Sequence, residues 1–301
     1  MQRSIHGILL LDKPPNITSN GALQKIKRLF HAKKAGHTRS LDPIATGMLP
    51  ICFGEATKFS QFLLESDKTY QVIGKLGIET TTGDTEGEII EAKSIEKITA
   101  TQIEQVFPDF VGEISQIPPM YSAIKFQGKP LYELARRGIE VERKPRRIHI
   151  FSLTLDQVYR DEFSFQVHCS KGTYIRTLVS DIGRKIGCGA HVVGLRRVMV
   201  APYQHVEMHG LPVLENIAEN NPQKLLDFLL PVETAVKSFP VVQLSMASIF
   251  YLRTGQAIRA TIPFHSSLVR LVSEDEKFLG MGEVTSDGRI KPHRLVSHWG
   301  D

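Results

Sequence analysis

Residues 36–47, with the sequence GHTRSLDPIATG, lie between two apolar, periodic segments, and the interpretation of the whole chain depends on them. Glycine and proline set tight backbone turns, and the hydroxyls of threonine and serine can cap nearby backbone groups. Asp42 directly precedes Pro43, which biases the aspartate toward extended backbone. The stretch therefore predicts either an active-site loop that holds one carboxylate on a stiff turn, or a structural loop whose aspartate caps that turn.

The composition is typical of a soluble globular protein with a sizeable core, since 42% of the 301 residues are hydrophobic and 23% are charged. No apolar run reaches the roughly 18 residues that a membrane span needs, and the apolar run near the N-terminus is too short for a secretory signal. Cys52, Cys169 and Cys188 form no CxxC pair, so we expect reduced, buried thiols with neither disulfide nor zinc. These features predict a cytoplasmic protein.

Positive charge gathers in two places, although the net charge is only +5. No acidic residue occurs between Asp12 and Asp42, where seven residues are basic. In residues 116–147, basic side chains alternate with aromatic ones, which fits a surface that binds the phosphate backbone and stacks bases. The alternative is a solvated charged face. The candidate RNA-backbone contacts of this segment are Lys125, Lys129, Arg136, Arg137 and Arg146.

The pattern of the first half predicts alternating strands and helices. Its expected elements are a buried strand at 8–11, a helix that begins at Ser19 as N-cap, a strand at 48–53, an amphipathic helix at 56–63, a period-two strand from Tyr70, a strand at 88–92 in a hairpin-like pair, and a helix opened by a Thr99/Gln102 capping box.

The second half predicts two strands, at 147–158 and 162–170, followed by a helix that carries Arg176 in its first turn. A positive charge there opposes the helix macrodipole, so an arginine at this position needs a partner. Its guanidinium suits a carboxylate, and Asp42 is the carboxylate whose role requires such a neighbour. A solvated arginine is the alternative.

A change of pattern near residues 231–240 predicts a domain boundary. Beyond it, one helical segment at 246–253 and three short strands at 268–272, 278–284 and 290–296 indicate a small β-domain. We therefore expect a large α+β domain over residues 1–240 and an appended β-barrel or sandwich over residues 241–301.

The usual nucleotide and metal motifs are absent. The sequence has no GxxxxGK[ST] loop, no GxGxxG after a strand, no HExxH, and no PCxxC to accompany His205-Val206-Glu207. What remains is a cofactor-free reaction on a nucleic acid.

Six segments, in order along nearly the whole chain, resemble the TruB family of bacterial tRNA pseudouridine-55 synthases. They are Leu11-Asp12-Lys13-Pro14 with Thr18-Ser19, the stretch 36–47, Asp67-Lys68-Thr69-Tyr70, residues 117–123 (IPPMYSA), residues 172–177 (GTYIRT), and Leu195-Arg196-Arg197. The resemblance implies a pseudouridine synthase fold, which is a mixed, largely antiparallel sheet with flanking helices, followed by a small C-terminal PUA-like RNA-binding β-barrel.

The resemblance also implies roles for individual residues. Asp42 matches the catalytic nucleophile, Tyr70 matches the tyrosine that stacks on the flipped base, and Arg176 matches the arginine that pairs with the catalytic carboxylate and lowers its pKa. In the substrate site, His37 matches the histidine that fills the space left by the uridine, while Tyr174 and Leu195 match the lining of the base pocket.

The substrate implied is the T-stem-loop of tRNA, and residues 116–147 match a thumb-like insertion that closes over that loop. The reaction flips out one uridine, breaks its glycosidic bond, and rejoins the base through C5. It needs no cofactor, no metal and no protein partner, and we expect a monomer.

Two positions depart from the family pattern. Asn16 stands where the family has glycine, and asparagine tolerates a left-handed turn well. Arg39 replaces the second glycine of Gly-His-Thr-Gly, so we expect strain in the loop if that position has a positive φ, or a blocked approach if it lies against the RNA backbone. Alternatively, Arg39 adds a phosphate contact. The altered loop therefore leaves open a non-catalytic tRNA-binding or tRNA-folding protein of the same fold. A separate alternative is a metal-dependent nuclease that uses Asp42, His37 and Asp12.

Overall fold

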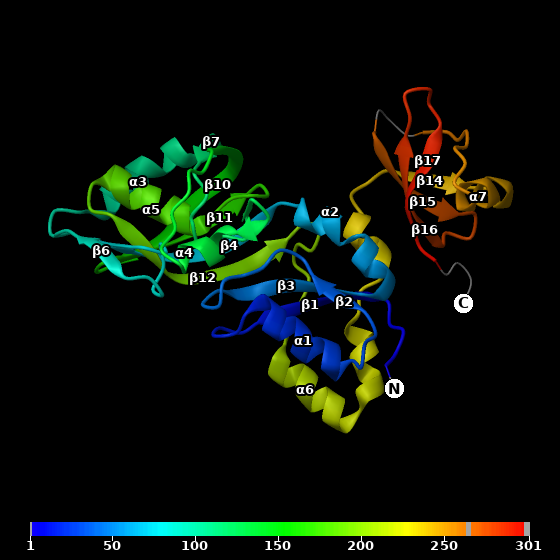
Figure 1. Cartoon of the computed structure of the whole chain (residues 1–301), viewed down its shortest axis with the longest axis horizontal. Helices are drawn as coiled ribbons and strands as arrows, with labels where there is room; N and C mark the ends of the chain where they lie inside the picture. The colour runs from blue at the N-terminus through cyan, green and yellow to red at the C-terminus, as the bar shows by residue number, and fades with distance from the viewer. Residues whose placement is uncertain (1, 263–265, 298–301) are drawn as a thin grey trace. The chain divides into compact units, whose positions relative to one another are not determined.

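The structure is a computed structural model that describes residues 2–262 and 266–297. Its contacts divide the chain into two compact units. Unit 1 comprises Met1–Asp42, Leu49–Glu65 and Pro202–Asp301, and unit 2 comprises Pro43–Met48 and Ser66–Ala201. Figure 1 shows the elements of both units along the chain.

Unit 1 holds a short sheet with helices, and a second sheet near the C-terminus. Its elements are β1 (Gly7–Lys13), α1 (Ser19–Leu29), β2 (Ala35–His37), most of β3 (Thr46–Phe53), the 3-10 helix η1 (Gly54–Lys58), α2 (Ser60–Leu64), β13 (His209–Gly210), α6 (Leu211–Asn220), η3 (Pro222–Phe228), η4 (Val232–Val236), β14 (Val241–Leu244), α7 (Met246–Arg253), β15 (Leu268–Ser273), β16 (Phe278–Val284) and β17 (Ile290–Leu295).

In the first sheet of unit 1, β1 lies between β13 and β3, and β2 pairs antiparallel with β3. Strand β1 is buried because Ile8 to Leu11 form a continuous apolar run, and it ends where Pro14 and Pro15 remove ladder donors. Helix α1 buries Ala22 and Ile26 at helical spacing, as its sequence predicts.

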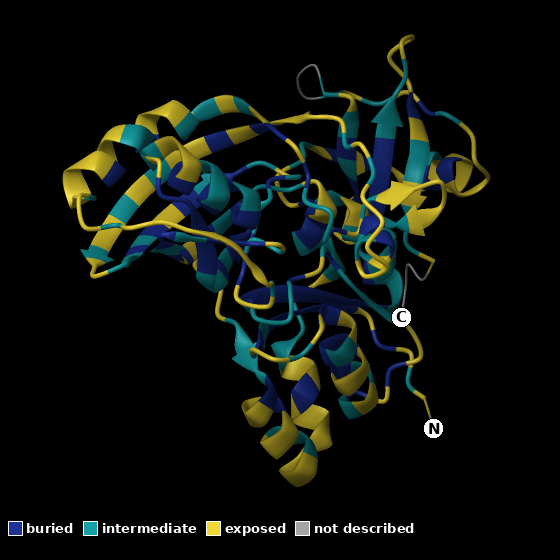
Figure 2. Cartoon of the chain, turned by 60° about the vertical axis from the view of Figure 1, so that its left-hand side comes forward, coloured by how far each residue is buried: buried dark blue, intermediate teal, exposed yellow. Residues whose placement is uncertain are grey.

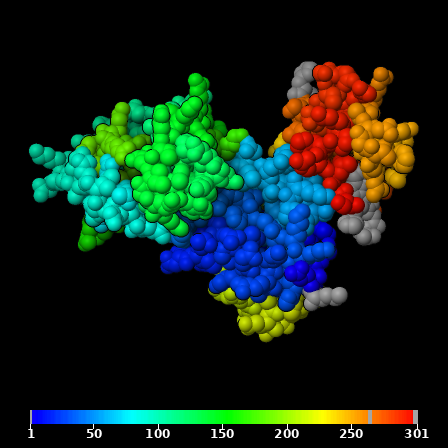
Figure 3. Space-filling view, viewed as in Figure 1, coloured from blue at the N-terminus to red at the C-terminus, as the bar shows by residue number. Residues whose placement is uncertain are grey.

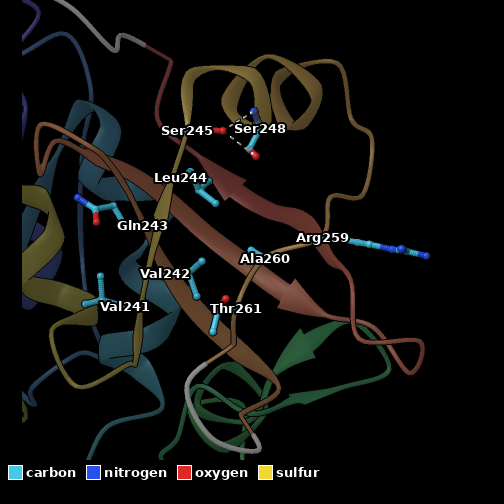
Figure 4. A pocket seen from close by; sticks show the side chains of 9 residues that line it. All are labelled: Val241, Val242, Gln243, Leu244, Ser245, Ser248, Arg259, Ala260 and Thr261. Carbon is cyan, nitrogen blue, oxygen red and sulfur yellow. Dashed lines mark hydrogen bonds between the residues drawn. The ribbon is translucent and has the colours of Figure 1, made fainter.

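The C-terminal part of unit 1 is a four-stranded sheet in the order β14-β15-β16-β17 within the described residues. Its strands and α7 enclose a core of their own, which consists of Val242, Leu244, Ile249, Leu252, Ile258, Val269, Leu271, Leu279 and Ile290. Figure 4 shows a hollow beside the edge strand β14, with polar groups from Gln243, Ser245 and Ser248 and with Arg259 extending outward. The expected small β-domain is confirmed as a sheet with one helix.

Unit 2 is built on a larger sheet. Its elements are the start of β3, β4 (Lys68–Leu76), β5 (Ile78–Thr80), β6 (Ile89–Ala92), α3 (Ala100–Val106), the 3-10 helix η2 (Phe107–Phe110), β7 (Gly112–Gln116), β8 (Lys125–Phe126), β9 (Lys129–Pro130), α4 (Leu131–Ala135), β10 (Arg146–Tyr159), β11 (Glu162–Cys169), α5 (Ile175–Ile186) and β12 (Ala190–Val200).

The strands of this sheet follow the order β3-β12-β4-β11-β10-β7, and all pairs are antiparallel except the parallel pair of β3 and β12. Buried residues alternate with intermediate or exposed ones along β4 and β11, because one face of each strand packs against the core. Figure 2 colours the chain by burial and shows such changes along its strands. Helix α5 covers that face, since a Cβ added at Gly74 of β4 would lie 3.1 Å from Val179. The prediction of a mixed, largely antiparallel sheet with flanking helices is confirmed.

Several details of the sequence prediction were wrong. The N-cap of α1 is Thr18, whose side chain accepts the Gly21 N–H, because the hydroxyl of Ser19 is engaged elsewhere. The hairpin partner of β6 is the short strand β5 and not the strand from Tyr70. The helix expected at 56–63 is split into η1 and α2, and β2, β7, β13 and β14 were missed because such short or polar strands lack a clear period-two pattern.

Candidate active site

The loop that carries Asp42 joins β2 to β3, and its backbone is fixed from unit 1. The Thr38 N–H donates to the Pro50 carbonyl at 3.1 Å. The buried hydroxyl of Ser19 accepts the Leu41 N–H at 2.8 Å and donates to the Leu41 carbonyl at 3.0 Å. Both backbone groups of the residue directly before Asp42 are therefore held by one side chain of α1.

The far end of the loop is fixed within unit 2. Gly47 has a φ of 96°, and a Cβ there would lie 2.2 Å from the Arg197 carbonyl oxygen, so only glycine fits. The fully buried guanidinium of Arg197 donates from Nε to the Met48 carbonyl at 2.7 Å. These contacts attach the start of β3 to β12 directly after the loop.

Both departures from the family pattern lie at positive φ. Asn16 has a φ of 61° and Arg39 a φ of 26°. The first is a conformation that asparagine adopts at low cost, whereas the second is unfavourable for arginine. The expected strain at Arg39 is thus present in the loop, three residues before Asp42.

His37 lies in β2 opposite Ile51 of β3, and Gly36 lies opposite Cys52. Burial raises the pKa of the Cys52 thiol to about 12, so this cysteine is protonated at neutral pH. Although Cys52 is close to the loop, a buried thiol with a raised pKa is a poor nucleophile.

Tyr70 and Leu195 share one face of the unit 2 sheet. Tyr70 is paired with Arg197 and Val72 with Leu195 across β4 and β12, and directly opposed residues point to the same side. Tyr70 is 8% exposed. It belongs to the same alternating set as Gly74, against which α5 packs, so Tyr70 and Leu195 lie on the helix-covered face.

Tyr174 and Arg176 come from the start of α5. Tyr174 is the N-cap residue, and its backbone is clamped by the side chain of Gln116, which donates to the Tyr174 carbonyl at 3.3 Å and accepts its N–H at 3.0 Å. Arg176 occupies the first turn and is buried. The structure therefore brings Tyr70, Tyr174, Arg176 and Leu195 to the same side of the sheet.

The guanidinium of Arg176 is held from two other segments. It donates to the Asp84 carboxylate at 3.3 Å, to the Thr82 carbonyl at 2.9 Å, and to the Tyr121 carbonyl at 2.8 Å. Asp84 in turn accepts from the Thr82 hydroxyl and from the Glu86 N–H at 3.0 Å. Arg176 thus has a carboxylate partner in Asp84, which the sequence did not predict, while its pairing with Asp42 stays a prediction.

Sequence reasoning missed Asp84 and Ser19 as parts of the site. Asp84 lies in a turn rich in threonine and glycine, where an aspartate indicates only a local backbone cap. Ser19 was assigned to helix capping, because nothing in the sequence shows that α1 passes beside Leu41. Both roles depend on contacts across long sequence separations.

The five predicted RNA-backbone residues of unit 2 are all exposed. Figure 3 shows the surface of the segment that bears them in green. The segment that bears them folds as the β8–β9 hairpin and α4, anchored by buried Leu131 and Leu134. The guanidinium of Arg136 lies 5.5 Å from the centroid of the Tyr132 ring. The five residues are Lys125, Lys129, Arg136, Arg137 and Arg146. Within the described residues, none of them forms an ion pair.

Neither a metal cluster nor a membrane helix is found in the described part of the chain. No group of three or more His, Cys, Asp or Glu side chains among residues 2–262 and 266–297 could hold a metal ion. Over the same residues, no helix is both long and apolar enough to span a membrane.

Comparison with known proteins finds relatives that align over nearly the whole chain. The tRNA pseudouridine synthase B of Coxiella burnetii (strain RSA 493 / Nine Mile phase I) is 54% identical over 297 residues, which cover 98% of this chain and 96% of that protein. The chain belongs to the TruB family. The tRNA pseudouridine synthase B of Nitrosococcus oceani is 50% identical over 294 residues, with 98% of this chain and 96% of that protein covered.

Three TruB family models match successive parts of the chain. The TruB family pseudouridylate synthase N-terminal domain matches residues 27–175, the tRNA pseudouridylate synthase B C-terminal domain residues 176–237, and the pseudouridine synthase II TruB C-terminal domain residues 240–296.

Solved structures share the fold of this TruB protein. The structure of an H/ACA RNP bound to a substrate RNA containing 2′-deoxyuridine aligns with a TM-score of 0.74 at 22% identity and covers 96% of this chain and 84% of that one. A Cbf5-Nop10-Gar1 complex aligns with the same TM-score at 25% identity, with 98% and 84% covered. The pseudouridine synthase fold predicted from the sequence is confirmed.

Proposed function

We propose that the protein isomerises uridine to pseudouridine at position 55 in the T-loop of tRNA. The observation that carries the proposal is the arrangement of buried Arg176, fixed by Asp84, on the same side of the sheet as Tyr70 and Leu195. Such a site offers a stacking ring, an apolar wall and a fixed positive charge, which suit a flipped base beside a carboxylate. Membership of the TruB family supports the same reaction.

In the proposed reaction, the C1′–N1 bond of the uridine breaks, the uracil turns within the site, and C1′ bonds to C5. The C5 proton leaves and N1 gains a proton, so that the mass of the RNA is unchanged. Asp42 acts as the nucleophile. Attack at C1′, attack at C6 and elimination of the base all require the carboxylate of Asp42 to be ionised beside the flipped base, so the proposal holds for each route.

Rigid support of Asp42 agrees with this role. Ser19 holds both backbone groups of Leu41, and the Gly47 contact with Arg197 fixes the other end of the loop. A nucleophile held in this way loses little freedom on reaching the reacting atom, which is a large part of what an enzyme supplies. We assign Arg176 to keep Asp42 ionised, and Tyr70 to stack on the base and to move the C5 proton.

The proposal also assigns RNA-binding roles to residues that take no part in the reaction itself. His37 occupies the space that the flipped uridine leaves, and Tyr174 and Leu195 line the base pocket. The five exposed cations of residues 116–147 contact the T-stem-loop backbone, since each lacks a described acidic partner and can bind phosphate.

We also propose that residues 1–240 form the catalytic domain and residues 241–301 a PUA-like RNA-binding domain. The separate core of the C-terminal sheet supports this division. The hollow beside β14, where Gln243, Ser248 and Arg259 stand among apolar residues, supports a role in RNA contact (Figure 4). The enzyme acts in the cytoplasm on its tRNA without a protein partner.

The test is incubation of the protein with an unmodified tRNA transcript that carries tritium at C5 of uridine. We expect tritium release, and a pseudouridine at position 55 when the product is mapped by carbodiimide labelling. Asp42→Asn should abolish release while RNA affinity changes by less than about threefold, because only a transition-state interaction is lost.

Other results would overturn the proposal. RNA binding without release, unaffected by Asp42→Asn, would identify a tRNA-binding protein that does not catalyse. Shortened RNA in the presence of divalent ions would identify a nuclease, since an isomerase leaves the length and mass of the RNA unchanged.

A further inference from the structure

Three rings lie side by side on the uncovered face of the unit 2 sheet. The ring of Phe151 lies between the imidazoles of His149 and His168, with centroid distances of 4.7 and 4.9 Å and interplanar angles of 42° and 41°. His149 and Phe151 belong to β10, and His168 belongs to β11. We call these three residues the ring ladder.

Phe151 joins the ladder through the regular alternation of β10, next to a β-bulge. Arg147, His149 and Phe151 are exposed, whereas Ile148 and Ile150 between them are buried. The register of β10 on β11 then shifts between Ile150, opposite Cys169, and Ser152, opposite His168, so Phe151 is the extra residue of the bulge. The phenyl ring is 44% exposed and lies between the two imidazoles.

The ladder lies on the opposite face of the sheet from Tyr70. Val167, directly opposite Tyr70 across β4 and β11, is buried together with Cys169, and His168 points the other way between them. RNA that reaches the ladder is therefore not the uridine that stacks on Tyr70.

Charge around the ladder favours RNA over an acidic partner. Arg147 precedes His149 by two residues on the same face of β10 and is 83% exposed, although it also pairs with Glu113 at 3.0 Å. Lys171 follows β11 and is exposed, next to Ser170, whose hydroxyl accepts the His149 N–H at 2.8 Å. In the described part of the chain, no ion pair engages the imidazole of His149 or His168.

The ladder is also continuous with the segment that we assign to RNA. Strand β7 is the edge of the unit 2 sheet, and the basic segment 116–147 leaves β7 and enters β10 at Arg146. His149 follows Arg146 by only three residues on β10. A single-stranded RNA that contacts these cations and continues past the edge of the sheet therefore reaches the ring ladder.

We propose that the ring ladder is a second RNA contact, which stacks unpaired bases of a single-stranded stretch outside the T-loop. Exposed aromatic rings on an open sheet face bind single-stranded RNA in this manner, because every base offers a π-face. The proposal rests on the proposed function in one respect, namely that RNA is the substrate.

The test compares Phe151→Ala with the parent protein on three RNAs, which are an unstructured 12-nucleotide oligouridine, an isolated T-arm hairpin, and a full tRNA transcript. We expect affinity for the oligouridine and the full tRNA to fall by about tenfold, the loss typical of one stacked base. Affinity for the hairpin and the single-turnover isomerisation rate on it should not change. Phe151→Trp should keep the affinity of the parent protein.

Tyr159→Ala is the matched control, since Tyr159 is a 59% exposed ring on the same strand, at its far end. It should leave all three affinities unchanged. Because Phe151 and Tyr159 are both on the surface, both variants should fold, and thermal unfolding checks this directly.

Three outcomes would overturn the proposal. Unchanged affinity of Phe151→Ala for the oligouridine and the full tRNA would remove the second contact. Equal weakening on the hairpin would place the ladder in the T-arm site. A change of oligomeric state in light scattering, without a change in RNA affinity, would make the ladder a protein contact. Failure of the proposed function is separate, because it would show as absence of pseudouridine in tRNA treated with the parent protein.

Discussion

The carboxylate of Asp84 lies 3.3 Å from the guanidinium of Arg176, and both side chains are buried. Asp84 is itself fixed by the Thr82 hydroxyl and the Glu86 N–H, so the turn that contains it forms a rigid acceptor for the arginine. Tyr121 adds a carbonyl acceptor from the basic segment. The position of Arg176 is thus determined by two chain segments. One is the turn that contains Thr82 and Asp84, and the other is the segment 116–147, which the sequence predicts to contact RNA.

Asp84→Asn should therefore impair catalysis through Arg176. Asparagine can keep the neutral hydrogen bonds of the turn but removes the charge that Asp84 places 3.3 Å from the buried guanidinium, which costs about 3 kcal/mol of unfolding free energy. We expect single-turnover isomerisation to slow by about tenfold or more while RNA affinity changes little, because a displaced arginine weakens transition-state stabilisation more than binding. Urea unfolding and tritium release measure the two effects.

Asp161→Asn is the matched control for that variant. Asp161 pairs with Lys75 at 2.9 Å, but both side chains are about one-third exposed, at 37% and 33%. Removing this pair should cost at most about 1 kcal/mol and leave the rate unchanged. If Asp84→Asn behaves like Asp161→Asn, then Asp84 does not position Arg176.

Ser19→Ala should loosen the catalytic loop. The variant removes both hydrogen bonds to Leu41 and leaves a buried N–H and carbonyl to find other partners, at a cost of about 1 to 3 kcal/mol in stability. Because Leu41 directly precedes Asp42, we expect kcat to fall several-fold with a smaller change in KM.

Thr18→Ala separates this effect from damage to α1. Thr18 caps the same helix through the Gly21 N–H, and its loss costs about 1 kcal/mol without touching the loop. A similar fall in kcat in both variants would show that helix stability, and not the Leu41 contact, controls the rate.

Much of the fold could be predicted because it depends on local pattern. The alternation along β4 and β11, the Thr99/Gln102 capping box of α3 and the apolar face of α5 all follow from residues close together in sequence. Elements that depend on distant partners were missed. Strand β14 has only four residues and exists because β15, well beyond it in sequence, pairs with it.

The candidate site was likewise predictable only where it depends on local residue types. The turn residues around Asp42 and the need of Arg176 for a carboxylate are readable from residue types. Which carboxylate lies near Arg176 is decided by tertiary packing, and Asp84 is 92 residues away in sequence. Ser19 was likewise predicted only as a helix cap, because helical spacing does not show that Ser19 lies beside Leu41 in space.

Cys52 should make stability depend on alkaline pH. Burial raises the pKa of its thiol from about 9 to about 12, so the folded protein keeps the proton that the unfolded chain releases. The unfolded state then binds fewer protons, and unfolding free energy falls above pH 9 by up to about 1.4 kcal/mol per pH unit. Below pH 9 the thiol contributes no pH dependence.

The measurement is urea unfolding of the parent protein and Cys52→Ala between pH 8 and pH 10 under reducing conditions. The stability advantage of the parent should be constant up to pH 9 and shrink above it. Ile51→Val, a change in the neighbouring residue without a titratable group, should differ from the parent by an amount independent of pH. Parallel curves for the parent and Cys52→Ala would contradict the prediction.

Arg39→Gly should stabilise the protein. Arg39 has a φ of 26°, where a residue with a Cβ carries about 1 to 2 kcal/mol of strain, and glycine removes this strain at the cost of greater freedom in the unfolded chain. We expect a net gain of about 1 kcal/mol in urea unfolding, and isomerisation at least as fast as in the parent protein. Arg39→Ala keeps the strain while removing the guanidinium, so it should be less stable than Arg39→Gly. A glycine variant that is as stable as the parent but slower would contradict this expectation. The lower rate would then come from the loss of the arginine side chain, and the guanidinium of Arg39 would be assigned to an RNA contact.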